Sequence, residues 1–346
     1  MSYWFWKSPD IAIDLGSSTV RIAVAGEGLV VEEPAVVALN KQTGQILGQG
    51  TAIGRIARHM VGRTPETIEA VFPIRHGVIT EFQLCEQMLK HLITKALGSS
   101  VKRPRTLVAV PASLTQVERR AVLTTLDRAG LGKVYLMEQS RVAGIGSGLP
   151  VSEPVANVVC DLGGGTTEIA VMSLGGIVSG SSLRIAGEEL DQAIVSMLRK
   201  NYSMRISHQF AQQVKHQAGS ASALREEQQI EVRGIDSISG MARKAIVTTE
   251  EIREALSEPL HKIANEIKET IERCGPQLVA DVAQSGMTLT GAGALLTGMD
   301  RYLEEALSIP VTIAISPQQT VVRGLQVCLE HFELWKNVFE QERQAA

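Results

Sequence analysis

The sequence predicts a duplicated α/β fold made of two domains with the same plan. An apolar strand that ends in an aspartate and a turn of small residues occurs twice, around Asp14 and around Asp161. Each occurrence is followed by two more strand-like stretches, then by helices, further strands and an inserted polar segment. The 346 residues suffice for two domains of ordinary size. An internal repeat on this scale therefore indicates two related halves.

The first half predicts a strand meander followed by alternating helices and strands. Residues 10–15, 19–25 and 29–39 are apolar or alternate, with glycine turns between them, which predicts three sequential antiparallel strands. Residues 40–75 are turn-rich and predict a small inserted lobe. The apolar periodicity beyond them predicts helices over 81–97, 115–129 and 139–147 and strands over 106–110 and 134–137.

The second half repeats this plan. It predicts strands over 155–161, 167–173 and 176–182, a helix over 188–200, and a polar, Gln-rich inserted lobe over 202–250. A capping box from Thr248 to Glu251 opens a helix near 250–273. The rest predicts strands at 287–290 and near 310–315 and helices at 299–307 and 317–334. Since ligands usually bind in clefts at domain interfaces, we expect a cleft between the two domains.

The composition excludes several classes of protein. The chain is 44% hydrophobic and 21% charged, as expected for a packed interior, and its net charge of −3 does not favour nucleic-acid binding. The basic cluster Lys102–Arg105 is most simply a solvated loop. The four cysteines lie far apart without metal-ligand spacing, which argues against zinc or disulfides and favours a reducing cytoplasm. No apolar run reaches the roughly 20 residues that span a bilayer.

The N-terminus carries an unusual aromatic cluster. Tyr3, Trp4, Phe5 and Trp6 include two of the three tryptophans, and Lys7 follows directly. Trp and Tyr favour the membrane–water interface, so residues 1–9 are interpreted as a membrane-binding segment. The alternative is a plug that packs on the surface of the protein itself. So short a segment binds weakly alone, and many copies in an assembly would add their affinities.

The two strand-end turns predict phosphate binding. Glycines allow backbone N–H groups to point into a concave nest that suits phosphate oxygens, and hydroxyls add donors without bulk. The candidate residues are Gly16, Ser17, Ser18 and Thr19 in the first turn and Gly163, Gly164, Gly165, Thr166 and Thr167 in the second. Asp14 and Asp161 would repel phosphate, so we expect them to hold Mg²⁺ through its waters. The chain lacks the GxxxxGK[ST] motif, and no GxGxxG opens a helix after the first strand.

Stretches along nearly the whole chain resemble one family. They are DIAIDLGSSTVRIAV, EEPAVVAL, GRTPETIEAVFPIRHGVITEF, VAVPASLTQVERRAV, GIGSGLPVSEP, VVCDLGGGTTEIAVMSLGGIV, GEELDQAI and MTLTGAGALLTGMD. Together they resemble the actin/Hsp70/sugar-kinase ATPase superfamily and, within it, the MreB family of bacterial actins. The resemblance implies an actin-like fold: two domains, each with a mixed five-stranded sheet flanked by helices and a small inserted subdomain, with a nucleotide cleft between them.

The resemblance also implies subdomain boundaries. Subdomain IA would contain residues 10–32, 73–150 and 317–346, IB residues 33–72, IIA residues 151–187 and 250–316, and IIB residues 188–249.

The resemblance further implies site residues, and the chain departs from the family pattern at three places. Glu138 and Gln139 stand where the family has Asp-Glu before the small-residue helix, and the family's Glu orients the attacking water. Gln139 can position water but cannot take its proton, although eukaryotic actin also has glutamine at the matching place. The predicted catalytic residues are Gln139, Asp161 and Glu138. The predicted nucleoside-binding residues are Gly187, Gln212, Gln213, Lys215, Gly291, Ala292, Gly293 and Ala294.

The other two departures lie among these nucleoside-binding residues. Gln212 and Gln213 replace a Glu-Arg pair near the ribose, and Ala292 replaces the middle glycine of a triplet, where its methyl would crowd the adenine. The helix with Val117, Arg120 and Leu123 resembles the family's antiparallel filament contact. For each of these three residues, a helix that simply covers the sheet is an equal alternative.

The leading functional hypothesis is a cytoskeletal protein of the inner membrane face. It would bind ATP and Mg²⁺, form membrane-associated antiparallel double filaments, and organise cell-wall synthesis and rod shape. Expected partners are further copies of the chain, other bacterial actins and cell-wall elongation membrane proteins, but no nucleic acid. A nucleotide-binding membrane scaffold with little ATP turnover, or a co-assembling partner of another bacterial actin, is the alternative. A sugar or acetate kinase is disfavoured, because it would need an acidic base that the sequence does not display. A chaperone of Hsp70 type is also not expected, because no substrate-binding domain follows residue 346.

Overall fold

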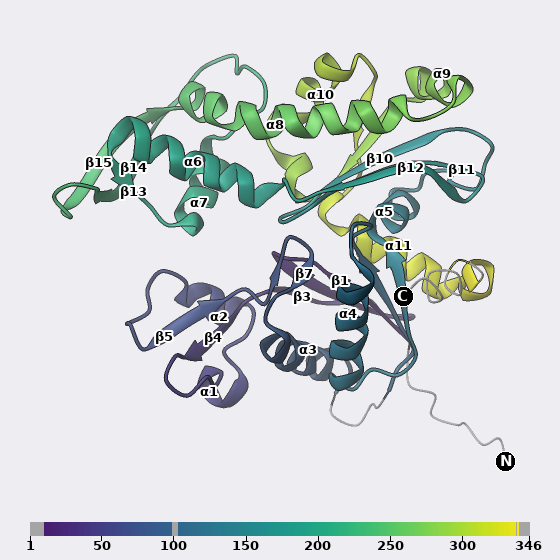
Figure 1. Cartoon of the computed structure of the whole chain (residues 1–346), viewed down its shortest axis with the longest axis horizontal. Helices are drawn as coiled ribbons and strands as arrows, with labels where there is room; N and C mark the ends of the chain where they lie inside the picture. Colours follow the sequence, from purple (N-terminus) through teal and green to yellow (C-terminus); the bar gives the residue numbers. More distant parts are fainter. Residues whose placement is uncertain (1–9, 99–102, 337, 339–346) are drawn as a thin grey trace. The chain divides into compact units, whose positions relative to one another are not determined.

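The computed structural model describes residues 10–98, 103–336 and 338, and it divides into two compact units (Figure 1). Unit 1 contains the described residues up to Gly148 and those from Gln319 onward, and unit 2 contains Leu149–Gln318. The predicted aromatic membrane segment with Tyr3, Trp4, Phe5 and Trp6 lies outside the described residues. Among the described helices, none is both long enough and apolar enough to cross a bilayer.

Unit 1 is built on a mixed five-stranded sheet in the order β3-β2-β1-β8-β9. The first three strands pair antiparallel, whereas β8 and β9 run parallel to β1. Their bounds are β1 Ile11–Leu15, β2 Thr19–Val24, β3 Gly28–Pro34, β8 Thr106–Val110 and β9 Val134–Glu138. The three parallel strands therefore end at one edge of the sheet, where loops usually carry function.

Helices cover both faces of this sheet. The helices α3 (Phe82–Leu97) and α4 (Gln116–Arg128) pack in one core with Ile11, Ile13 and Leu15 of β1. The helices α5 (Gln139–Gly146) and α11 (Thr320–Glu330) pack together, and α11 contacts β1. Since side chains alternate along a strand, Asp14 points to the face opposite the α3–α4 core.

The prediction of one strand over residues 29–39 is wrong. The strand β3 ends at Pro34, which has no N–H to continue the ladder, and the N–H of Ala35 donates to Ser18 O instead. The chain continues as β4 (Val37–Asn40), which pairs with β5 (Ile68–Val71) in a separate sheet. The short helices α1 (Leu47–Gly50) and α2 (Arg55–Met60) complete this insertion, and the hairpin of β6 (Ile74–Arg75) and β7 (Val78–Ile79) follows.

Unit 2 repeats the sheet of unit 1. Its strand order is β12-β11-β10-β16-β17, with the same antiparallel and parallel pairings at the corresponding places. The bounds are β10 Asn157–Leu162, β11 Thr167–Ser173, β12 Gly176–Leu183, β16 Met287–Thr290 and β17 Val311–Ile313. The predicted duplication into two mixed five-stranded sheets is confirmed.

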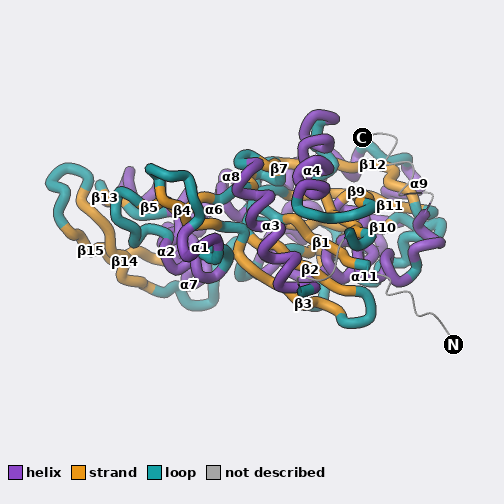
Figure 2. The backbone as a smooth tube through the Cα atoms, turned by 90° about the horizontal axis from the view of Figure 1, so that it is seen from below, coloured by secondary structure: helices purple, strands orange, loops and turns teal. Residues whose placement is uncertain are grey.

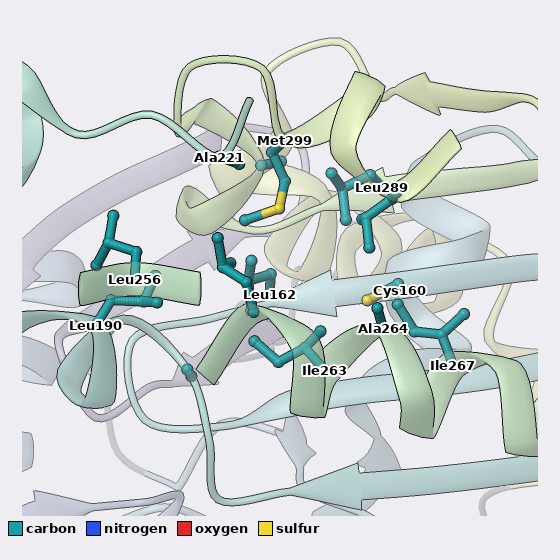
Figure 3. Packing of buried hydrophobic residues seen from close by; sticks show 14 of the residues in the cluster. Cys160, Leu162, Leu190, Ala221, Leu256, Ile263, Ala264, Ile267, Leu289 and Met299 are labelled. Atoms are coloured by element: carbon teal, nitrogen blue, oxygen red, sulfur yellow. The ribbon is translucent and has the colours of Figure 1, made fainter. Parts of the chain in front are cut away.

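The helix α8 (Thr249–Glu272) carries much of the unit 2 core. Figure 3 shows Ile263, Ala264 and Ile267 of α8 gathered with Cys160 and Leu162 of β10. The capping box that the sequence predicted at its start is present: Thr248 Oγ1 accepts from the N–H of Glu251, whose carboxylate accepts from the N–H of Thr248. The helices α9 (Pro276–Ser285) and α10 (Met299–Leu307) follow, and the sequence analysis did not predict α9.

An insertion extends unit 2 between β12 and α8. The helices α6 (Gly187–Tyr202) and α7 (His208–Ala218) pack against each other beside a three-stranded sheet (Figure 1). The strands of this sheet are β13 Met204–Arg205, β14 Gln229–Asp236 and β15 Ala242–Thr248. Figure 2 shows β14 and β15 running alongside each other.

Candidate functional site

Loop 1, defined as Gly16–Thr19, joins β1 to β2 directly after the strand-end aspartate. A Cβ atom at Gly16 would come within 2.8 Å of Thr19 O, so the turn is too tight for any other residue without displacement. Ser17 is buried, and its Oγ accepts a hydrogen bond of 2.9 Å from the N–H of Gly77 in the β6–β7 hairpin. Loop 1 is therefore a fixed turn that is attached to a second element of unit 1.

Asp14 is buried and paired. Its Oδ2 lies 3.1 Å from Arg21 Nη1 on the neighbouring strand β2. The same guanidinium donates from Nε to Glu32 Oε1 on β3 at 2.8 Å. The side chains of Arg21 and Asp14 are only 12% and 9% exposed, so water screens this pair little, whereas Glu32 is 36% exposed. Arg21 was not among the residues predicted from the sequence.

Glu138 and Gln139 lie at the same sheet edge as Asp14. In the parallel register, Asp14 stands opposite Ala109, and Val110 stands opposite Glu138. Glu138 is the N-cap of α5, and Gln139 is its first residue. Both side chains are half-buried. Unit 1 thus brings its predicted catalytic and phosphate-binding residues to one edge, as expected for parallel strands.

The position of α5 depends on two glycines at its crossing with α11. A Cβ atom on Gly146 would collide with Thr320 O, and one on Gly324 would collide with Val142 O. Arg323 Nε of α11 also donates a 2.6 Å hydrogen bond to Gly146 O. The two backbones therefore approach closely and hold the helix that begins at Gln139. A glycine within the apolar periodicity of a helix was the available sequence signal for Gly324.

Loop 2, defined as Gly163–Thr166, has the same place in unit 2. The N–H of Gly163 donates to Thr166 O at 2.9 Å, and a Cβ on Gly163 would approach that oxygen equally closely. The next residue, Thr167, is fully buried and donates from Oγ1 to Ile185 O at 2.6 Å. In this conformation the Thr167 hydroxyl proton is thus used within the protein rather than offered to a ligand.

Asp161 is part of a buried polar group at the end of the unit 2 strands. Its Oδ1 accepts a 2.8 Å hydrogen bond from Thr290 Oγ1 on β16. Glu168 on β11 stands opposite Asp161, and its Oε1 accepts a 2.6 Å hydrogen bond from Ser182 Oγ. Glu168 is fully buried. A charged residue inside an apolar run was the sequence signal for both Glu168 and Arg21, and the sequence analysis used neither.

The helix α6 begins against loop 2. The N–H groups of Gly187 and Glu188 donate to Gly163 O and Gly164 O at 3.2 and 2.8 Å. A Cβ atom on Gly187 would lie within 3.4 Å of these two loop residues. Glycine at position 187 therefore has a structural role that does not depend on a nucleoside, because it lets α6 begin close to loop 2.

Lys215 of α7 is buried and makes two contacts within unit 2. Its Nζ donates to Gly187 O at 2.7 Å and lies 2.8 Å from Asp191 Oδ1 of α6. Burial raises the pKa of Asp191, although the charge of Lys215 opposes this. Gln212 is half-buried and Gln213 is exposed on the same helix. The structure thus places Lys215 against the start of α6.

The third glycine turn packs onto the end of β10. Gly291 has φ of +81°, and a Cβ there or on Gly293 would collide with Leu162. The N–H of Gly291 donates to Pro317 O at 2.9 Å. Ala294 is buried, whereas Ala292 is exposed, so its methyl group does not pack into the turn. The turn therefore lies beside Asp161 and Leu162 and forms one assembly with loop 2.

Carboxylates are too few at either loop for a protein-only metal site. Among the described residues, no three His, Cys, Asp or Glu side chains are placed to hold a metal together. Mg²⁺ usually keeps several waters and takes one or two carboxylates plus substrate phosphates. Asp14 and Asp161 fit that mode of binding, in which water and phosphate supply the other ligands.

A groove of about 680 Å³ lies elsewhere in unit 2, between α6 and α8. Most of the described residues that line it are polar or charged, and none of them is a predicted nucleotide residue.

The predicted filament contact lies on α4, and its three residues differ in exposure. Val117 is 76% exposed, and Arg120 is also exposed. Leu123 is half-buried and packs against the unit 1 core. Val117 and Arg120 thus lie on the exposed face of α4, whereas Leu123 belongs to the face that covers the sheet.

Sequence comparison decides the family. The family model described as "MreB/Mbl protein" matches residues 8–337. The chain belongs to the MreB/Mbl family. It is 43% identical over 329 residues to "Cell shape-determining protein MreB" of Escherichia coli (strain K12), covering 94% of this chain and 95% of that protein. It is 40% identical over 325 residues to "Cell shape-determining protein Mbl" of Bacillus subtilis (strain 168), covering 94% and 96%.

Solved structures agree with this membership of the MreB/Mbl family. MreB5 of Spiroplasma citri, in crystals with AMPPNP and with ADP, matches with a TM-score of 0.89 and 31% identity, covering 95% of this chain and 98% of that chain. A chain of the MamK double helical filament matches with a TM-score of 0.77 at 19% identity, covering 93% and 98%, which supports the fold alone. The predicted family and actin-like fold are confirmed.

Proposed function

We propose that this member of the MreB/Mbl family is an actin-like cytoskeletal protein that binds ATP with Mg²⁺ and polymerises. The observation that carries the proposal is the repeated strand-end loop. Loops 1 and 2 each follow a buried aspartate and are each too tight for a side chain at the first glycine. The crystals of the Spiroplasma relative with AMPPNP and ADP support nucleotide as the ligand.

In this proposal, both loops bind the phosphates of one nucleotide. Backbone N–H groups and the hydroxyls of Ser17, Ser18, Thr19 and Thr166 would donate to phosphate oxygens. Asp14 and Asp161 would hold the waters of Mg²⁺, which neutralises phosphate charge when bound. Gln139 would orient the attacking water. The nucleoside would lie against Gly187 and the third glycine turn, with Lys215 supporting the start of α6.

The proposal extends to filaments on a membrane. The names of the Escherichia coli and Bacillus subtilis relatives support a function in cell shape. We infer antiparallel double filaments that use the α4 surface, and attachment to the inner face of the cytoplasmic membrane through Tyr3, Trp4, Phe5 and Trp6. The filaments would organise cell-wall synthesis with elongation membrane proteins or with other bacterial actins. The proposed boundaries of the four subdomains remain those of the sequence prediction.

Electron microscopy on anionic lipid tests this function. The purified chain is imaged with and without ATP and Mg²⁺, beside a variant that lacks residues 2–8. We expect double filaments that need ATP and that leave the lipid when residues 2–8 are removed. The absence of filaments under every condition would contradict autonomous polymerisation, and filaments that ignore nucleotide would contradict coupling to ATP.

A second candidate is a nucleotide-binding scaffold with little turnover, which the glutamine at position 139 favours. An amide can position water but cannot act as a general base. Phosphate release is measured for the wild type, for Gln139→Glu and for Gln284→Glu, a control with the same chemical change at an exposed position of α9. Release by the wild type that exceeds the no-protein background during assembly favours the first function. Binding without release, restored only by Gln139→Glu, favours the scaffold.

A further inference from the structure

The two sheets carry matching rows of side chains across their strand ends. The pairing registers define row 1 as Ala109, Asp14, Arg21 and Glu32, and row 2 as Thr290, Asp161, Glu168 and Ser182. Each row crosses four strands and passes through the aspartate that lies two residues before the first glycine of the loop, Gly16 in loop 1 and Gly163 in loop 2. Because the rows are equivalent in the duplicated fold, each serves as an internal reference for the other.

The rows differ in charge at one position. Row 1 has Arg21 next to its aspartate, with 3.1 Å between Nη1 and Asp14 Oδ2. Row 2 has Glu168 at the equivalent place. Each of its two acids accepts a hydrogen bond from a hydroxyl group, Glu168 from Ser182 at 2.6 Å and Asp161 from Thr290 at 2.8 Å. One strand-end aspartate is thus paired with a cation, and the other stands opposite a second carboxyl group.

This difference matters because each aspartate stands just before a loop that is proposed to bind phosphate. An ionised carboxylate next to a phosphate repels it, and low exposure strengthens that repulsion. In row 1 the guanidinium offsets the Asp14 charge, and Glu32 holds the guanidinium through its Nε at 2.8 Å. The four residues that define row 2 include no arginine or lysine, so the arginine next to the aspartate is a feature of row 1.

We propose that Arg21 is a positioning residue for loop 1, acting through Asp14. It offsets the charge of the Asp14 carboxylate and fixes its orientation, so that loop 1 accepts nucleotide phosphate. The inference rests on the proposed nucleotide function and deepens it. It implies that the charge of the aspartate before loop 1 is offset before any ligand arrives.

A double-mutant cycle tests this inference. The dissociation constant of N-methylanthraniloyl-ADP is measured, with and without Mg²⁺, for the wild type, Arg21→Met, Asp14→Asn and the double variant. Arg21→Met removes the guanidinium that offsets the Asp14 charge, so we expect at least about tenfold weaker binding. The double variant should bind within about threefold of Asp14→Asn alone, because the charge that needed compensation is gone. Arg21→Lys should retain most of the affinity.

Two outcomes would overturn the inference. If the double variant binds as weakly as Arg21→Met, the arginine acts directly or only on the fold, not through Asp14. If Arg21→Met binds like the wild type, the ion pair has no influence on loop 1. Should the wild type bind no nucleotide, the proposed function fails, and thermal unfolding decides the ion-pair claim: Arg21→Met should lower Tm, and Asp14→Asn should restore part of the loss. Additive Tm changes would refute it.

Discussion

Substitution of Gly146 by alanine tests the close crossing of α5 and α11. The added Cβ would collide with the backbone carbonyl of Thr320, an atom that cannot rotate away as a flexible side chain can. The helices must therefore separate, and the hydrogen bond from Arg323 Nε to Gly146 O must lengthen from 2.6 Å. The start of α5, where Gln139 lies, would shift with the helix.

Two opposing terms set the expected size of the effect. Overpacking of a well-packed contact costs about 1–3 kcal/mol, and a collision with backbone belongs at the upper end. Alanine is favoured over glycine in a helix by about 1 kcal/mol, which offsets part of that cost. The net loss is about 2 kcal/mol. For a unit of 150–250 residues, this corresponds to a Tm that is lower by roughly 4–8 °C.

Thermal unfolding followed by circular dichroism measures the loss. Gly275→Ala is the matched control, because that glycine has φ of −67° and nothing lies within 4 Å of its Cβ position. We expect the control to lower Tm by no more than roughly 2–4 °C, because alanine is less favourable than glycine at an N-cap by about 1 kcal/mol or less. If Gly146→Ala and Gly275→Ala are equally mild, the helices are not held apart by their backbones and the reasoning is refuted.

Three further changes probe other parts of the chain. Burial raises the pKa of Glu33, but the hydrogen bonds from Lys95 and from the N–H of Arg55 outweigh it, so the pKa lies below 4.5. Because this pKa is lowered in the folded protein, ionised Glu33 adds stability above pH 4.5, and this stability is lost as the pH falls through the lowered pKa. Between about pH 4.5 and 3, Tm should therefore fall less steeply in Glu33→Gln than in the wild type. Lys215→Met leaves Asp191 buried without its cation and should cost about 3 kcal/mol in denaturant unfolding; an unchanged midpoint would show that the pair is dispensable. Val117→Asp should leave Tm within about 2 °C, because the side chain is 76% exposed, but should convert double filaments into single ones in micrographs. Persistent doublets would exclude Val117 from the contact.

The repeated loops were predictable from the sequence because short-range patterns define them. Asp14 and Asp161 each end an apolar strand before small residues, and the structure puts both at strand ends. Pairing across strands was not predictable in the same way. Arg21 is only an arginine in an apolar run until the register shows that Asp14 and Glu32 stand on either side of it.

Two other features escaped sequence reasoning for physical reasons. The helix α9 begins with Pro276 directly after a glycine, a combination that also marks turns, and only one of its residues is fully buried. Lys215 was assigned to the nucleoside, but its partner Asp191 lies on another helix, and only the packing of α6 against α7 brings the two together. The site roles derived from the family resemblance remain predictions.

The hydrogen bond from Gly77 to Ser17 joins loop 1 to a hairpin that is 60 residues away along the chain. Because the Ser17 hydroxyl accepts a hydrogen bond from Gly77, the directions in which its O–H can point are restricted. The hairpin therefore influences where Ser17 can donate a hydrogen bond. Thermodynamic reciprocity then applies: any molecule that favours one orientation of that hydroxyl at the loop also favours one position of the hairpin, by the same free energy. Under the proposed function, contact with the hairpin alone would therefore change how tightly loop 1 holds its ligand.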